Sequence, residues 1–295
     1  MNIQLAAKEF YDYSNYFRGY SKDTIRRYTH AINYYVKFAQ IENLQQATDI
    51  SIKQMFLDGR MQRAWKPATF HSYQKSLAVF FSWCKERGYM ISNPTDGLQS
   101  PKLARRLPRN LSQQDAMKLL EAVYNYPYTN IFIQSRNQAI ISMLIFAGLR
   151  KRELMNLKYS DVDFNQMTIF VSLGKGAKDR LIPISHALAK SLDHYITERK
   201  RNGITCAQFF ASSQRNRGIS EMTIRRLVEI MRTTTKISFT LHQLRHTFAT
   251  LMIEGGCDIY SLSRMMGHED IRTTTIYLSA TANHLQSQMM KHPLN

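Results

Sequence analysis

Hydrophobic residues recur at spacings of three and four along the first part of the chain, which is the period of an amphipathic helix. The clearest stripe follows Ser21, a residue suited to cap a helix, and it consists of Ile25, Tyr28, Ile32, Tyr35 and Phe38. Residues 48–58 and 67–87 show two further helical patterns. Residues 1–100 are therefore expected to form an all-helical domain.

The second part of the chain combines helical patterns with one β segment. Helices are expected at residues 115–124, 136–147, 187–201 and 220–232. Between them, residues 167–171 and 181–184 are short runs of residues that favour strands, and they flank a basic, glycine-containing loop. The pattern predicts a mixed α+β domain over residues 111–280 with a small sheet or hairpin, so the whole chain is expected to be mainly α.

Residues 93–110 differ in composition from both halves. Three of the seven prolines fall there, and the segment is rich in basic residues. Such a composition is typical of an extended linker between domains. We place this linker at residues 101–110 and expect its basic charge to run along a phosphate backbone, so that two domains close around a duplex. The basic residues expected to contact DNA are Lys102, Arg105, Arg106 and Arg109 in this segment and Lys178 in the β segment.

The net charge narrows the class of partner. The chain has 40 Lys and Arg residues against 22 Asp and Glu residues, a formal charge of +18. Such a surplus suits a phosphate polymer or an anionic membrane. No apolar run is long enough to cross a bilayer and the N-terminus lacks the apolar core of a signal peptide, so we expect a cytoplasmic protein that binds nucleic acid. The three cysteines have no CxxC pair, which argues against a disulfide framework or a zinc site.

Residues 240–277 collect the residues best suited to chemistry. Thr240 and Gln243 form a capping box at the start of a helix that Gly255 ends, and His242, Arg245 and His246 share one face of it. A second short helix is expected at residues 259–266, just before His268. Thr273, Thr274 and Thr275 are expected to cap a third helix with an exposed Tyr277 near its start, and a tyrosine beside Arg and His can act covalently. The alternative is that each histidine only caps a helix or makes a buried hydrogen bond.

Two further positions carry candidate chemistry outside this stretch. Gly148 interrupts an apolar helix, so Arg150 is expected at the start of the next helix, where free backbone amides also favour an anion. Glu153 is placed to hold that arginine or a neighbouring group. Lys175 lies between two glycines in the basic loop, which permits close approach of the backbone to a phosphate. An Arg and a Glu three residues apart are more often an ordinary surface ion pair.

Taken together, these motifs resemble those of a known family. Arg150 in GLRKREL, Lys175 in GKGAKDR, His242 and Arg245 in HQLRHTFAT, His268 in MGH and Tyr277 in TTTIY resemble the catalytic set of the tyrosine recombinases, the lambda-integrase and Xer group. The order and the spacing of the motifs are also similar. The resemblance implies a SAM-like helical core-binding domain followed by a catalytic domain.

The resemblance also implies roles. Tyr277 is expected to attack a DNA phosphate and form a 3'-phosphotyrosyl bond, with Arg150, Arg245 and His268 on the phosphate oxygens. Lys175 is the expected acid for the leaving 5' oxygen, and His242 is expected to assist proton transfer. Because the phosphotyrosine conserves the bond energy, no ATP is needed. The resemblance also implies neither a cofactor nor a metal.

The implied partner is double-stranded DNA. The tail, residues 281–295, is expected to dock on a neighbouring protomer, which would give a homo-tetramer or a hetero-tetramer with a related recombinase on two DNA sites. A DNA translocase such as FtsK is a further implied partner. Xer-like resolution of chromosome dimers is the expected role, and integration or excision of a small mobile element is the alternative. A type IB topoisomerase and an inactive DNA-binding regulator are less favoured by the tail and by the complete set of six residues.

Overall fold

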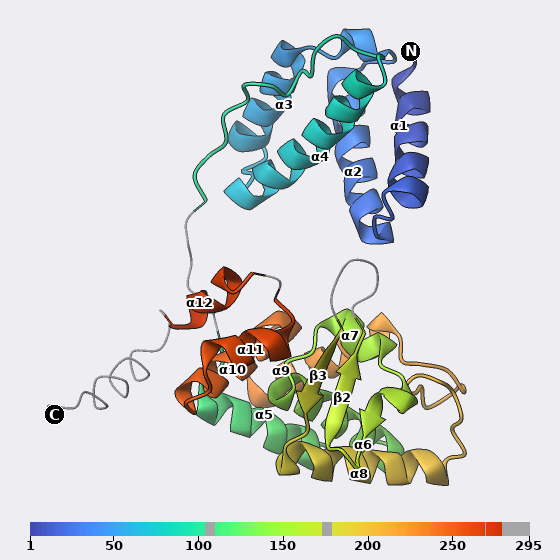
Figure 1. The fold of residues 1–295 in the computed structure, drawn as a ribbon, viewed down its shortest axis with the longest axis vertical. Coiled ribbons are helices and arrows are strands. Elements are labelled where there is room, and N and C mark those ends of the chain that lie inside the picture. The colour runs from blue at the N-terminus through green and yellow to red at the C-terminus, as the bar shows by residue number, and fades with distance from the viewer. Residues whose placement is uncertain (104–109, 173–178, 269, 279–295) are drawn as a thin grey trace, which may run out of the picture. The chain divides into compact units, whose positions relative to one another are not determined.

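The computed structural model describes residues 1–103, 110–172, 179–268 and 270–278, and the chain divides into two compact units, Met1–Arg105 and Arg106–Asn295. We call them the N-terminal and C-terminal units. Figure 1 shows the N-terminal unit as helices alone and the C-terminal unit as helices around a small sheet. The expectation of a mainly helical protein is confirmed.

The N-terminal unit is built from four α-helices and two short irregular ones. They are α1 (Ile3–Asp12), a π-helical turn (Tyr13–Phe17), α2 (Lys22–Ala39), a 3-10 turn (Leu44–Gln46), α3 (Asp49–Met61) and α4 (Pro67–Glu86). Polar N-caps fix three of the starts, because Asn2, Ser21 and Thr48 accept hydrogen bonds from first-turn amides. The helices enclose an aromatic core that includes Phe10, Tyr35, Phe56, Phe80 and Phe81.

The C-terminal unit contains eight described α-helices and a three-stranded sheet. The helices are α5 (Gln113–Asn125), α6 (Ile131–Phe146), α7 (Lys151–Asn156), α8 (His186–Arg201), α9 (Glu221–Thr235), α10 (Leu241–Glu254), α11 (Ile259–Met266) and α12 (Arg272–Leu278). After a 3-10 turn (Tyr159–Asp161) come the strands β1 (Val162–Asp163), β2 (Thr168–Val171) and β3 (Arg180–Pro183). The sheet is antiparallel in the order β1-β2-β3, with Val171 opposite Arg180.

Helix α6 forms the centre of the C-terminal unit. Residues such as Ile140, Ile141, Leu144 and Ile145 are all buried, as expected for a helix that is apolar on every side. It packs against α5, α8 and α10. The site-bearing helices α11 and α12 in turn pack against α10, and α11 also contacts β3 (Figure 1). The core therefore fixes α10 and, through it, the segments around residues 259–278.

The third helix of the site region differs from the sequence prediction. Thr273, Thr274 and Thr275 lie inside α12 rather than ahead of it, and the side chain of Asp270 accepts the hydrogen bond from the Arg272 amide. Tyr277 is the sixth residue of this helix, near its end. Its side chain is 2% exposed, so the expectation of an exposed tyrosine is wrong.

Candidate active site

Arg150 and Glu153 are positioned by the break between α6 and α7. Gly148 adopts a positive φ of 59°, and a Cβ at this position would lie 2.3 Å from the Phe248 ring, so the turn requires glycine. Arg150 then becomes the N-cap of α7. Glu153 accepts hydrogen bonds from the Arg150 amide at 2.8 Å and from its guanidinium at 2.7 Å. The expected Arg-Glu pair is thus confirmed, with the carboxylate buried and the guanidinium half-exposed.

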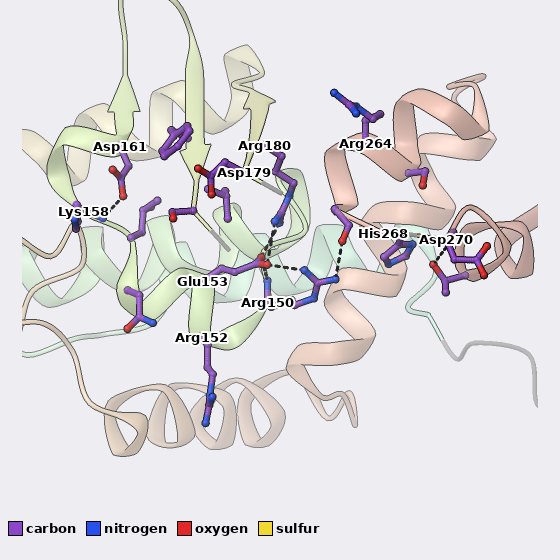
Figure 2. Close-up of a pocket in the computed structure, with 18 of the residues that line it drawn as sticks. Arg150, Arg152, Glu153, Lys158, Asp161, Asp179, Arg180, Arg264, His268 and Asp270 are labelled. Atoms are coloured by element: carbon purple, nitrogen blue, oxygen red, sulfur yellow. Dashed lines mark hydrogen bonds and ion pairs between the residues drawn. The ribbon is translucent and has the colours of Figure 1, made fainter. Parts of the chain in front are cut away.

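Arg180 is a second arginine on the same carboxylate. Its guanidinium donates to both Glu153 oxygens, at 2.7 and 3.1 Å, and to the Met265 carbonyl at 2.7 Å. Burial alone raises the pKa of Glu153, but the hydrogen bonds and charge of Arg180, followed by those of Arg150, outweigh it and lower this pKa to about 2. Glu153 is therefore ionised at every physiological pH. Figure 2 shows both arginines directed at this carboxylate.

Arg245 is the most buried of the three guanidinium groups at the site. It donates from α10 to the carbonyl oxygens of Gly148 and Met266, and it lies 4.0 Å from Glu153. Burial, and then the charge of Arg150, lower its pKa to about 10, so it stays protonated at neutral pH. Three guanidinium groups thus surround one carboxylate. The resulting excess of positive charge favours an anion that can accept hydrogen bonds from arginine, such as a phosphate.

His268 follows the turn that ends α11. Gly267 has a positive φ of 62° there, and a Cβ would meet the Arg180 side chain at 3.0 Å. The Gly267 carbonyl accepts a hydrogen bond from Arg150 at 3.2 Å. The Nε2 atom of His268 is 3.3 Å from Arg245, and its Nδ1 atom is 2.7 Å from the Thr274 hydroxyl. Burial, with the charges of Arg245, Arg150 and Arg180, lowers the pKa of His268 to about 4, so its ring is neutral.

Tyr277, on α12, contacts a histidine of α10. Its hydroxyl is 2.6 Å from Nδ1 of His246, whose ring packs 4.2 Å from that of His242. Burial raises the pKa of the Tyr277 phenol, although Arg245 and Arg150 act in the opposite direction. Burial also lowers the pKa of His242, which is exposed at one edge of the site.

An open cleft borders these residues. Its volume is about 1780 Å³, above the roughly 300–1,000 Å³ of common small-molecule pockets, which favours a segment of a polymer. Arg150, Glu153, Arg180, Gly267 and His268 all line it (Figure 2). A second hollow, lined by Arg150, His242 and Arg245, adjoins it.

The structure brings together five of the six predicted catalytic residues. Arg150, His242, Arg245, His268 and Tyr277 come from α7, α10, the turn after α11, and α12. The sixth, Lys175, lies outside the described residues, as do Arg105, Arg106, Arg109 and Lys178, while Lys102 is exposed in the N-terminal unit. The sequence did not predict two contacts of the site. They are the hydrogen bonds from Arg180 to Glu153 and the contact between His246 and the Tyr277 hydroxyl.

The described residues contain no helix long and apolar enough to cross a bilayer. Within the same residues, no cluster of His, Cys, Asp and Glu is arranged to hold a metal ion.

The fold and the cluster of arginines and histidines beside a tyrosine are suited to a protein that acts on a phosphate group of a large ligand. The sequence profile of the Phage integrase family matches residues 109–284, and that of the Phage integrase N-terminal SAM-like domain matches residues 7–91. The chain therefore belongs to the phage integrase family and is a tyrosine recombinase, an enzyme that cleaves and religates DNA. The SAM-like fold expected for the helical first domain is confirmed.

Similar proteins share most of their length with this chain. Tyrosine recombinase XerA of Pyrococcus horikoshii is 33% identical over 278 residues, which cover 94% of this chain and 90% of the relative. Tyrosine recombinase XerC of Oceanobacillus iheyensis is 29% identical, with 99% and 97% covered. The crystal structure of a XerA recombinase is 26% identical, covers 99% of both chains and superposes with a TM-score of 0.55.

Proposed function

We propose that this chain is a Xer-like recombinase that resolves dimers of circular DNA in the cytoplasm, with Tyr277 as the nucleophile. The observation that carries the proposal is the arrangement of two arginines and a histidine on neighbouring segments around Gly267, with a buried tyrosine on the adjoining helix. Similarity to XerA and XerC proteins over more than 90% of this chain supports the Xer-like role.

The geometry suggests a division of labour among the site residues. Arg150 and Arg245 hold the non-bridging oxygens of the scissile phosphate, and His268 hydrogen-bonds to the same oxygens. Glu153 keeps Arg150 in place. Tyr277 attacks phosphorus and displaces the 5' oxygen, to which Lys175 gives a proton. A 5'-hydroxyl of the partner strand then reverses the step, so that cleavage and religation use the same groups.

Recombination requires several such sites on DNA at once. We infer that Lys102, Arg105, Arg106 and Arg109 follow the DNA backbone, with Lys178 as a further contact. Residues 281–295 dock on a neighbouring protomer and form a tetramer on two DNA sites. A DNA translocase such as FtsK is the accessory partner that this role calls for.

The nucleophile is tested with Tyr277→Phe. A binding site is first selected from a pool of random duplex DNA and then prepared as a half-site with a nick, so that the cleaved strand is lost and the adduct is trapped. Wild-type protein should form a denaturant-resistant adduct, whereas Tyr277→Phe should bind the half-site with nearly unchanged affinity and form none. Tyr260→Phe is the control, since Tyr260 is an exposed tyrosine of the same unit that lines the cleft. An adduct with Tyr277→Phe would exclude Tyr277 as the nucleophile.

The Xer-like role has its own test. A plasmid dimer with the selected site in direct repeat should be resolved to monomers. If the protein instead joins separate plasmids efficiently and leaves the dimer unresolved, the mobile-element alternative replaces dimer resolution.

A further inference from the structure

The hydroxyl of Tyr277 makes a short polar contact with His246. His246 lies on α10, one helical turn after His242, and its Nδ1 atom is 2.6 Å from the Tyr277 hydroxyl. The two ring centroids are 5.5 Å apart and the planes are inclined by 52°, so this is an edge contact through the nitrogen. The mechanism proposed above assigns no role to His246.

The charged surroundings set the protonation of this pair. His242 and Arg245 face His246 from its own helix, His268 lies on the turn before α12, and Arg150 adds its charge from the start of α7. Burial, followed by the effects of His242 and Arg245, lowers the pKa of His246 to about 4. Burial raises the pKa of the phenol. At neutral pH the pair is therefore a neutral imidazole and a protonated phenol.

We propose that His246 is the general base that takes the proton from Tyr277 during strand cleavage. As the phenol oxygen bonds to phosphorus, its proton moves to Nδ1 of His246, while the bond from phosphorus to the 5' oxygen breaks and that oxygen receives a proton from the separate acid. In religation the incoming 5'-hydroxyl loses its proton to that acid, and the departing phenolate recovers its proton from His246. Atoms and charges balance in both directions. The inference rests on Tyr277 being the nucleophile.

DNA itself supplies the basicity that the free site lacks. Arg245 disfavours a positive charge on His246, and a bound phosphate brings a negative charge to this guanidinium group. The proton affinity of His246 rises as a result when substrate is in place. The rings of His242 and His246 form a T-shaped pair with centroids 4.2 Å apart, so we assign His242 as a positioning residue for this step.

The test compares the pH dependence of cleavage in wild type and His246→Asn. Asparagine places an amide near the position of Nδ1, so a hydrogen bond to the phenol is retained but a proton cannot be taken. Adduct formation on the nicked half-site is measured in a single turnover at saturating protein, from about pH 6 to pH 9. His186→Gln is the matched control, because His186 is an exposed histidine on α8 of the same unit.

A general base gives a specific result. Near pH 7, His246→Asn should be on the order of 100-fold slower than wild type. The cleavage rate of His246→Asn should rise about tenfold for each unit of increasing pH, because the phenol must then lose its proton to the solvent before it attacks. The wild-type rate should change little over the same range. His186→Gln should follow wild type. A merely structural role predicts the same fractional loss at every pH, and that result, or an unchanged rate, overturns the proposal.

A second variant guards against a folding defect. His246→Ala leaves space beside the phenol, and added imidazole should restore a measurable part of its cleavage rate, increasing with the imidazole concentration. Absence of rescue in a variant that binds the half-site normally counts against the general base. The Tyr277→Phe experiment tests a different assignment. An adduct formed by that variant would exclude Tyr277 as the nucleophile, whereas a negative result with the His246 variants would exclude only His246 as the general base.

Discussion

Glu153→Gln should destabilise the C-terminal unit by about 3 kcal/mol at neutral pH. The carboxylate is 6% exposed and accepts hydrogen bonds from Arg150 and Arg180, and the Arg180 side chain is equally buried. Glutamine has nearly the same shape but no charge. The substitution therefore leaves the Arg180 guanidinium buried without its counter-ion, which is far more costly than losing an exposed ion pair.

The magnitude follows from the pKa of Glu153. A fall from its ordinary value of 4.5 to about 2 corresponds to about 3 kcal/mol, since each pKa unit is worth about 1.4 kcal/mol. Because the folded-state pKa is the lower one, this stabilisation is present above pH 4.5 and is lost as pH falls towards 2. About 2 kcal/mol of it should be gone at pH 3.

The assay must follow the C-terminal unit alone. Both tryptophans, Trp65 and Trp83, lie in the N-terminal unit, so tryptophan fluorescence reports the unfolding of that unit only. Hydrogen exchange of peptides from α6 and α10 reports the unfolding of the C-terminal unit. Tryptophan fluorescence then serves as an internal control, because the urea transition of the N-terminal unit should not move. Glu121→Gln, at an exposed acid on α5, is the matched variant.

Two results would refute this reasoning. One is a loss of less than about 1 kcal/mol at pH 7, the range of an exposed ion pair. The other is a difference between wild type and Glu153→Gln that stays constant from pH 6 to pH 3. The site histidines also lower stability as the solution is acidified, because their pKa values are lowered in the folded state, but both proteins contain them and the difference cancels their contribution.

Three further predictions concern single groups of the site. Gly148→Ala should lower the free energy of unfolding of the C-terminal unit, measured by hydrogen exchange, by more than about 1 kcal/mol, because a Cβ would lie 2.3 Å from the Phe248 ring and the positive φ disfavours alanine. Equal protection of the amides in the variant and the wild type would contradict this. Thr274→Val removes the hydroxyl that holds His268 at 2.7 Å, so the cleavage rate should fall about tenfold with unchanged half-site binding. Lys175→Ala should cleave poorly on normal DNA but well when the bridging 5' oxygen is sulfur, a leaving group that needs no acid; failure of this rescue would assign the acid to another residue.

The sequence predicted those parts of the fold whose signals are local. The capping box of Thr240 and Gln243 is present as expected, and α11 begins and ends at the predicted residues, because caps and glycine stops act within one turn. The contact between Arg150 and Glu153 was also predicted, because the two residues are three positions apart in the sequence. Arg180 was not identified as part of the site, because its sequence neighbours are a basic loop and its carboxylate partner lies 27 residues away.

The error at Tyr277 has a physical cause in the length of its helix. Helix α12 has seven residues, fewer than two full turns, and a stripe of period 3.6 cannot be recognised in so short a segment. A run of threonines was therefore interpreted as a polar cap, whereas Thr274 is fully buried and hydrogen-bonded to His268. The same turn of helix that buries Thr274 directs Tyr277, three residues later, towards α10 and onto His246. Helix α12 thus couples the group expected on the phosphate to the group expected to attack it, so a shift of this short helix would move both at once.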